Sequence, residues 1–492
     1  MQFLSIYFLF FLLVTLVGYY CVPNKYKHVF IFAVNILFYL TWITDVKYLF
    51  SLISVIIITY FGPLWMHKVD KKKRKKILCC GILIIVGALV YFKYTPFLVE
   101  NWNELLKLTR SSFTKVHVDI IMPLGVSFYT FQALSYYIDV YKEKIPVEKN
   151  FILYASYVSF FPTITSGPIE RPQNLLYQLK KGENFSKINI KSGLVIFLWG
   201  AFVKLVITDR LAVLVNTVFA DYKIYGGMIL LLIAFAYALQ IYCDFSSYSL
   251  MAVGIGKLFG LNIVENFNVP YFSQTIQEFW RRWHISLSTW FRDYVYIPLG
   301  GNRCSIGRKN LNLFLTFLVS GIWHGANWTF IVWGAIHGIY QIVGNLTKEF
   351  RNKFYNYLNI NKSCFSFKFG RCAVTFVLVT FAWIFFRAPS FGEAIGYIQR
   401  IFISPQPWEL FDLSIYELGL SVLQMNILVM ALLLLFFIDY LKYKYNKNID
   451  QLLVTQNIWF QYLFIVGLFF FVFVFGMYGP AYNAQEFIYF QF

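Results

Sequence analysis

The chain carries little charge: Asp, Glu, Lys and Arg make up only 14% of its 492 residues, whereas a soluble domain has about 25%. Cysteine is also scarce. The seven cysteines form no C-x-x-C pair, which argues against a zinc site and against a disulfide framework. No basic residue precedes Lys25, so the charged start of a cleavable signal peptide is missing. We therefore expect residues 3–20 to form a first membrane span.

Motifs of nucleotide and hydrolase chemistry are missing as well. The sequence has no G-x-x-x-x-G-K-[ST] phosphate-binding loop and no G-x-S-x-G nucleophile elbow. No cluster of acidic residues indicates a two-metal site, and we expect neither a bound metal nor a resident cofactor. An ATP-driven pump and a serine hydrolase are therefore unsupported.

Long apolar runs dominate what is present. Hydrophobic residues make up 59% of the chain, and the mean hydropathy is +0.58. Runs close to the roughly 20 residues that a spanning helix needs lie at 3–20, 46–63, 77–94, 228–241, 420–438 and 458–477. A soluble core could not bury so many. The sequence predicts one all-α polytopic membrane domain over residues 1–492, with about eleven spans and additional re-entrant or interfacial helices.

Basic residues predict the orientation. Lys and Arg number 43 against 24 Asp and Glu, and the net charge is +19. Because cytoplasmic loops carry an excess of Lys and Arg, we place the basic stretches on the cytoplasmic side and expect no nucleic-acid partner. These stretches are residues 67–76, 142–149, 180–191, 303–309, 348–371 and 442–447. Counting spans from residues 67–76 puts the N-terminus outside the cytoplasm. The same charges could attract anionic lipid heads or a polyanionic donor such as a coenzyme.

Two segments are too irregular for simple spans. Residues 160–172 (FFPTITSGPIERP) contain three prolines, so no continuous helix fits. Broken backbone at membrane depth must be buried in protein or line a water-filled cavity. Residues 266–303 are aromatic, basic and amphipathic and end in Pro-Leu-Gly-Gly, which favours an interfacial or partly inserted helix.

Residues 319–334 (VSGIWHGANWTFIVWG) place His324 in an apolar segment. An ionisable side chain inside the membrane is costly and is a functional candidate by default. Gly321 and Gly325 would let backbone or substrate approach closely. A positioned histidine can take the proton of a hydroxyl that attacks a thioester. The alternative is a structural histidine bonded to a neighbouring helix.

Three neighbours of this histidine are further candidates. Trp323 and Trp328 could form the walls of a slot, and Asn327 is one of the few other polar side chains in the segment. We expect these residues to line a substrate path.

The motif FWRRWH, residues 279–284, places a second histidine, His284, directly after Trp283. Arg281 and Arg282 could bind phosphate or lipid heads in fork geometry. The equally weighted alternative is an interfacial helix with anchoring aromatics and snorkelling arginines.

Two other polar residues follow apolar sequence. Asp244 needs a partner there, and Lys204, Asp209 or Arg210 could supply one. Structural pairing is favoured over catalysis for Asp244. His337 has no acidic neighbour in the sequence, and we expect it to pack.

Residues 266–303, followed by SGIWHGANWTFIVWGAIHG, resemble the membrane-bound O-acyltransferase (MBOAT) family. The bacterial branch that contains the membrane subunit of alginate O-acetylation is the most similar. FFPTITSGPIERP, QIYCDFSSYSLMAVGIGKLFG and the terminal FIYFQF also fit this branch. The likeness follows nearly the whole chain in order and is most specific at residues 266–338.

The resemblance implies a helical bowl with a central tunnel in the bacterial cell membrane. It places His324 on the family's histidine and His284 on its second one. An acyl group would come from a cytoplasmic thioester, acetyl-CoA for acetylation, and pass outward to a polysaccharide, commonly through a secreted or anchored partner. His324 would act as general base, and His284 would orient the donor or stabilise developing charge. Trp323 and Trp328 would exclude water.

Other functions stay open. D-alanyl transfer to teichoic acid ranks lower because residues 371–492 look more like the alginate branch. A polysaccharide or lipid transporter, with the histidines as proton relays, would not depend on an acyl donor. A scaffold that recruits a secreted enzyme would tolerate loss of His324. The sequence does not name the acceptor polymer.

Overall fold

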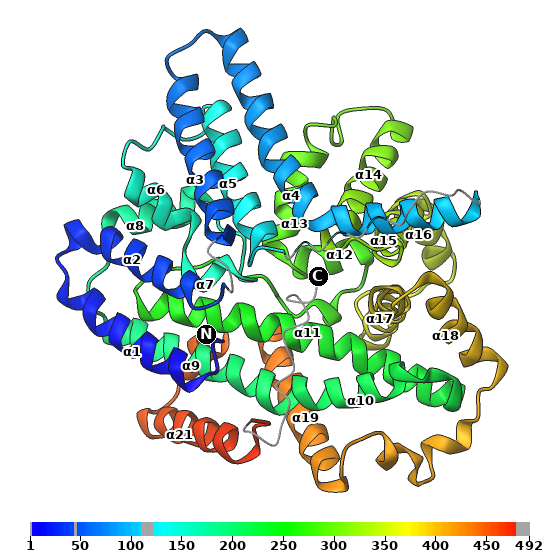
Figure 1. The fold of residues 1–492 in the computed structure, drawn as a ribbon. Helices are drawn as coiled ribbons and strands as arrows, with labels where there is room; N and C mark the ends of the chain where they lie inside the picture. Colours follow the sequence, from blue (N-terminus) through cyan, green and yellow to red (C-terminus); the bar gives the residue numbers. More distant parts are fainter. Residues whose placement is uncertain are drawn as a thin grey trace. The chain divides into compact units, whose positions relative to one another are not determined.

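A computed structural model describes residues 2–43, 47–109 and 122–478, together with residues 116, 118 and 120. Within these residues the regular structure is entirely helical, which confirms the predicted all-α class (Figure 1). The terminal motif FIYFQF lies outside the described residues. The chain divides into two compact units, Met1–Phe197 with Met251–Val264, and Leu198–Leu250 with Glu265–Phe492.

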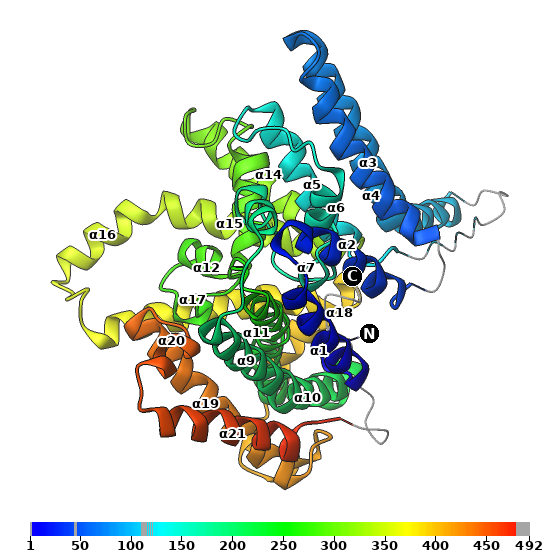
Figure 2. The ribbon, with the colours of Figure 1, turned by 90° about the vertical axis from the view of Figure 1, so that its left-hand side faces the viewer.

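The first unit contains the amino-terminal helices. In it α3 and α4 run side by side, as both ribbon views show (Figures 1 and 2). The helices are α1 Ile6–Cys21, α2 Lys27–Leu40, α3 Lys47–Met66, α4 Lys71–Leu108, α5 Val126–Tyr141, α6 Phe151–Val158, α7 Phe161–Ile164, α8 Tyr177–Lys181 and most of α9 Lys187–Phe202.

The second unit contains the remaining helices, and α11 contributes residues to both units. A π-helical turn, Val203–Thr208, joins α9 to α10. The helices are α10 Asp209–Ala220, α11 Gly227–Leu258, α12 Ile276–Arg282, α13 Ile285–Phe291, α14 Ile306–His324, α15 Trp328–Leu346, α16 Lys348–Tyr357, α17 Phe365–Arg387, α18 Phe391–Ile403, α19 Val422–Tyr445, α20 Ile449–Val454 and α21 Ile458–Phe475.

Seven helices of the described residues are long and apolar enough to cross a membrane. They are Tyr48–Met66, Lys71–Leu108, Lys187–Ala220, Gly227–Leu258, Phe365–Arg387, Val422–Tyr445 and Ile458–Phe475. Two shorter apolar helices, Ile6–Cys21 and Phe151–Ile164, add to these. The chain is thus a multi-pass membrane protein, and the total of about eleven spans stays a prediction.

The two irregular segments are broken, as the sequence indicates. Residues 160–172 hold only the four-residue helix α7 before a π turn begins at Pro172. Residues 266–303 hold two seven-residue helices, α12 and α13, and a π turn at Arg292–Tyr296. No helix within either segment is long enough to cross a bilayer.

Glu170 holds the first broken segment in place within its unit. Its carboxylate accepts hydrogen bonds from the Val264 backbone N–H at 2.7 Å and from Asn174 Nδ2 at 2.9 Å. Burial raises the pKa of Glu170 to about 7, although these donors favour the charged form and act in the opposite direction. The Glu170 carboxylate therefore accepts a hydrogen bond from the backbone N–H of Val264, which lies outside any helix.

Candidate functional site

The site begins where α14 and α15 cross at two glycines. A Cβ on Gly321 would lie 2.3 Å from the carbonyl oxygen of Phe330, and one on Gly334 would lie 2.5 Å from that of Phe317. Only glycine fits at such distances. The prediction that Gly321 permits a close backbone approach is confirmed. The crossing brings the end of α14, where His324 lies, against α15.

His324 is buried among aromatic rings from three helices. Its ring centroid lies 5.0 Å from that of Trp333 on α15, 5.4 Å from that of Phe386 on α17 and 5.0 Å from that of its neighbour Trp323. These rings meet the imidazole nearly edge to face. His324 therefore sits in surroundings that exclude bulk water.

His284 is buried at the sharp junction between α12 and α13. Its backbone is left-handed, with φ of +41°, which is uncommon for a residue with a side chain and often marks a functional site. The junction is held by Asn266, whose backbone carbonyl accepts the Ile285 N–H at 2.9 Å. The side-chain oxygen of Asn266 accepts the Ser286 N–H at 3.2 Å.

The same Asn266 oxygen determines which nitrogen of His284 is basic. It lies 3.4 Å from Nδ1 of His284. An oxygen that accepts from a backbone N–H carries no proton, so Nδ1 must be the donor and Nε2 the basic nitrogen. Burial lowers the pKa of His284 to about 3. The imidazole is therefore neutral near pH 7, with a hydrogen-bond acceptor at Nε2.

Trp323 lies between the two predicted histidines. Its ring centroid is 6.2 Å from that of His284 and 5.0 Å from that of His324. The structure thus brings together His284, Trp323 and His324, which come from two sequence motifs. This group of three is called the histidine–tryptophan cluster below.

The sequence did not predict that His337 would adjoin this cluster. Its ring centroid lies 5.0 Å from that of Trp333, the ring that also contacts His324. Nδ1 of His337 accepts the indole N–H of Trp280 at 3.2 Å, so Nε2 carries the proton. His337 therefore joins the FWRRWH motif to the glycine crossing, which agrees with the packing role expected for it.

The other residues of the apolar segment lie differently. Trp328 begins α15 and is 56% exposed. Asn327 caps that helix: its side-chain oxygen accepts the Thr329 N–H at 3.0 Å, and its amide donates to the Pro389 carbonyl at 3.1 Å. The second tryptophan against His324 is Trp333.

The FWRRWH motif separates into exposed and buried parts. Arg281 is exposed. Arg282 forms an ion pair with Glu278 at 2.9 Å, one helical turn away, and its guanidinium lies 5.5 Å from the ring centroid of Tyr443. Trp283 is buried. Of the two arginines, Arg281 is thus the one with the exposed charge.

Asp244 belongs to a buried ionic group. Lys204 Nζ lies 2.8 Å from Asp244 Oδ1 and 3.0 Å from Asp209 Oδ1, and the three side chains are almost fully buried. The arrangement confirms Lys204 as the partner that Asp244 needs, and Asp209 shares the same ammonium group. It favours structural pairing between two candidate spans.

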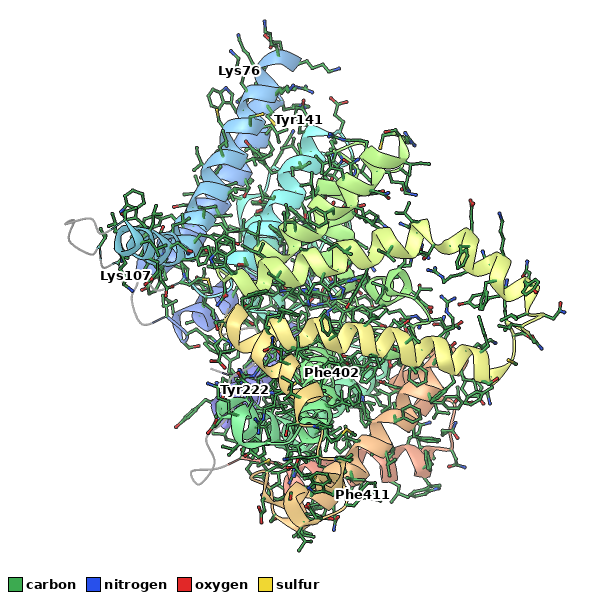
Figure 3. All side chains as sticks on the ribbon, turned by 90° about the vertical axis from the view of Figure 1, so that its right-hand side faces the viewer. Lys76, Lys107, Tyr141, Tyr222, Phe402 and Phe411 are labelled. Carbon is green, nitrogen blue, oxygen red and sulfur yellow. The ribbon has the colours of Figure 1, made fainter. Side chains whose placement is uncertain are left out.

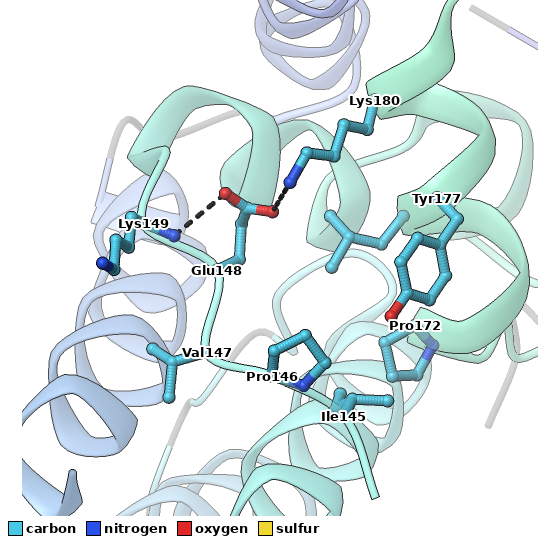
Figure 4. A pocket seen from close by; sticks show the side chains of 9 residues that line it. Ile145, Pro146, Val147, Glu148, Lys149, Pro172, Tyr177 and Lys180 are labelled. Carbon is cyan, nitrogen blue, oxygen red and sulfur yellow. Dashed lines mark hydrogen bonds and ion pairs between the residues drawn. The ribbon is translucent and has the colours of Figure 1, made fainter.

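A separate pocket of about 220 Å³ lies in the first unit (Figure 4). At its edge the Glu148 carboxylate forms an ion pair with Lys180 at 3.2 Å and accepts the Lys149 backbone N–H. The lining residues are Ile145, Pro146, Val147, Glu148, Lys149, Pro172, Leu176, Tyr177 and Lys180. None of them was predicted as a site residue.

The described residues contain no group of three His, Cys, Asp or Glu side chains that could hold a metal ion. The chemistry available in the histidine–tryptophan cluster is that of two buried imidazoles against aromatic rings. Such a site suits proton transfer in acyl transfer.

Residues 142–387 match the family model for MBOAT, the membrane-bound O-acyltransferase family. The chain belongs to this family and is an O-acyltransferase of the membrane. It is 37% identical over 454 residues to the "Probable alginate O-acetylase" of Pseudomonas aeruginosa, an alignment that covers 92% of this chain and 83% of the relative.

Two further relatives modify other envelope polymers, according to their names. The peptidoglycan O-acetyltransferase of Helicobacter pylori is 36% identical over 392 residues, covering 74% of this chain and 72% of the relative. The teichoic acid D-alanyltransferase of Bacillus subtilis is 31% identical over 267 residues, covering 50% of this chain and 64% of the relative. Two of these three names specify acetylation.

Proposed function

We propose that this protein takes an acetyl group from acetyl-CoA on the cytoplasmic side and passes it outward for O-acetylation of a polysaccharide, through a secreted or anchored partner protein. The names of the Pseudomonas and Helicobacter relatives support acetyl as the group and a polysaccharide as the acceptor. The shorter match to the D-alanyltransferase supports the lower rank of that alternative. The membrane is then the bacterial cytoplasmic membrane, with the N-terminus outside.

In this mechanism His324 is the general base. The acceptor hydroxyl, or a relay group, attacks the thioester carbonyl carbon while His324 takes the hydroxyl proton. The carbon–sulfur bond breaks, and the proton passes to the leaving CoA thiolate. His284, which is neutral and carries its proton on Nδ1, orients the donor as a hydrogen-bond acceptor at Nε2. Its alternative role, stabilising the negative charge on the carbonyl oxygen, does not fit this tautomer. Trp323 keeps water, the competing nucleophile, away from the thioester.

One observation carries this proposal: the histidine–tryptophan cluster, in which two buried histidines from separate motifs share the ring of Trp323. A protein that only recruits a partner does not need such a group. A proton-coupled transporter could use it, but transport would not require an acyl donor.

The test is a turnover assay on purified protein in nanodiscs with labelled acetyl-CoA. We expect free CoA release and label transfer by the wild type, and a loss of at least about 100-fold in His324→Ala, because general-base catalysis contributes that much. His67→Ala is the matched control, since His67 is exposed in the basic stretch 67–76.

Equal turnover in His324→Ala and wild type, with both proteins folded, would rule out His324 as the base. If acetyl-CoA gives no turnover in the wild type, the assay is repeated with a D-alanyl thioester on a carrier protein. Turnover with that donor alone would replace acetyl by D-alanyl in the proposal.

A further inference from the structure

The connection between α17 and α19, residues 388–421, exposes an unusual set of large apolar side chains. Phe411 is 89% exposed, more than any other large apolar side chain of the described residues, and Ile403, Phe402 and Leu413 are 79%, 78% and 75% exposed. Trp408 is also exposed. Phe402 and Phe411 are labelled in Figure 3. These five residues are called the 402–413 patch.

The backbone of this patch keeps it out of the hydrocarbon of the bilayer. After α18 ends at Ile403, the chain forms only short 3₁₀ turns at Pro407–Leu410 and Leu413–Glu417. Irregular backbone exposed to lipid does not occur in the hydrocarbon region, because its N–H and C=O groups would lack partners. The patch therefore lies at or beyond the interface, where exposed apolar side chains mark an interaction site.

The start of the patch is anchored to the first residues of α11 and to the loop before it. Ser404 and Pro405 offer their carbonyls to the backbone N–H groups of Gly227, at 2.6 Å, and Met228, at 2.8 Å. Arg400 donates from Nε to the Tyr225 carbonyl at 2.7 Å. A fixed surface loses little entropy when a partner binds.

The charge of the connection is opposite to that of the whole chain. Residues 388–421 contain four carboxylates, Glu393, Glu409, Asp412 and Glu417, and one basic residue, Arg400, although the chain carries a net charge of +19. The absence of Lys and the basic far ends of α17 and α19 place the connection outside the cytoplasm. Carboxylates beside the apolar residues also oppose contact with anionic lipid heads.

We propose that the 402–413 patch is the docking surface for the extracytoplasmic partner protein, whose contacting face is apolar and bordered by Lys and Arg. Aromatic anchors at the centre and charges at the rim are the usual composition of such interfaces. The proposal rests on the outward transfer proposed above, and it specifies where the partner protein binds.

The test places a photoreactive benzoylphenylalanine at position 411 of the full-length protein in intact cells. Position 459 is the control, because Trp459 is 80% exposed on α21, a candidate span. We expect position 411 to form a protein adduct and position 459 to form lipid adducts. A second sample combines Asp412→Asn with Glu417→Lys. Asn at 412 keeps an oxygen that can accept the Ser414 N–H.

The charge changes should reduce the adduct about tenfold, the loss expected when an interface loses about 1.4 kcal/mol. Phe411→Ala with Leu413→Ala should lower polysaccharide acetylation by a similar factor while leaving acetyl-CoA turnover in nanodiscs unchanged. Lipid adducts alone at position 411, no adduct, or a protein adduct that the charge changes do not affect would overturn the proposal. If the wild type turns over neither acetyl-CoA nor the D-alanyl thioester, the proposed function fails, and the crosslinking result still decides the docking surface.

Discussion

Replacing Lys204 by Met tests whether the buried ionic group that includes Asp244 is structural. Lys204 Nζ contacts Asp244 Oδ1 at 2.8 Å and Asp209 Oδ1 at 3.0 Å. Methionine keeps much of the apolar stem but leaves two neighbouring carboxylates without their shared cation. We expect this to be the most destabilising single change in the group.

The magnitude follows from burial. Removing one partner from a buried ion pair costs about 3–5 kcal/mol, because an uncompensated charge remains. Asp244→Asn should cost less, about 1–3 kcal/mol, the cost of weakening one buried hydrogen bond, since Lys204 keeps Asp209. The double variant should be more stable than Lys204→Met alone, because it buries one carboxylate fewer. The two changes are in contact and should not be additive.

Thermal unfolding in nanodiscs measures the order of these stabilities, with Cys243 as the reporter. This thiol is fully buried beside Asp244, so a thiol-reactive dye reports local opening when the other six cysteines are replaced. Acetyl-CoA turnover is measured below the unfolding midpoint. A stable Asp244→Asn protein with no turnover would make Asp244 catalytic. A Lys204→Met protein as stable as wild type would refute the energetic argument.

Three further changes have definite expected outcomes. Asn266→Ala should lower kcat about tenfold, because His284 loses the oxygen that orients its ring and a loss of about 1.4 kcal/mol is a factor of ten. Asn266→Asp keeps an oxygen there but adds a charge, so activity should be regained only in part. An unchanged kcat in Asn266→Ala would contradict the positioning role. His337→Phe should lower the unfolding midpoint, because the Trp280 N–H loses its acceptor. Turnover should stay within a few-fold of wild type. A large loss of turnover at an unchanged midpoint would make His337 catalytic. Burial raises the pKa of Glu170 from 4.5 to about 7, so its protonated form stabilises the fold fully below pH 4.5 and the effect is lost as pH rises through 7. As the pH rises from 5 to 8, the unfolding midpoint of the wild type should therefore decrease relative to that of Glu170→Gln. Parallel curves of midpoint against pH for the two proteins would exclude this titration.

The apolar runs of the sequence located five of the seven candidate spans but not Lys187–Ala220 or Phe365–Arg387, and they missed the full length of others. The run at 228–241 lies inside α11, which continues to Leu258. Ser246, Ser247 and Ser249 are buried there by protein rather than exposed to lipid. Hydropathy measures transfer into lipid, so it misses the part of a helix that packs against other helices.

The two histidines could be predicted from their surroundings in sequence, but the residues that position them could not. Asn266 acts on His284 across 18 residues, and Trp280 acts on His337 across 57. These contacts depend on the left-handed turn at His284 and on the glycine crossing of α14 and α15, which no local pattern specifies. The buried amide of Asn266 within an aromatic motif was the one available signal.

The aromatic surroundings of His284 also fit the orienting role proposed for it. A neighbouring carboxylate would stabilise the charged imidazole and raise its pKa, whereas apolar rings favour the neutral form. His284 instead faces the ring of Phe245 at 4.5 Å and an uncharged amide oxygen. Its neutral form is therefore favoured, and protonation of this ring during the reaction would be unfavourable. His284 can thus orient the donor without competing for the hydroxyl proton, which His324 takes and passes on to the leaving thiolate.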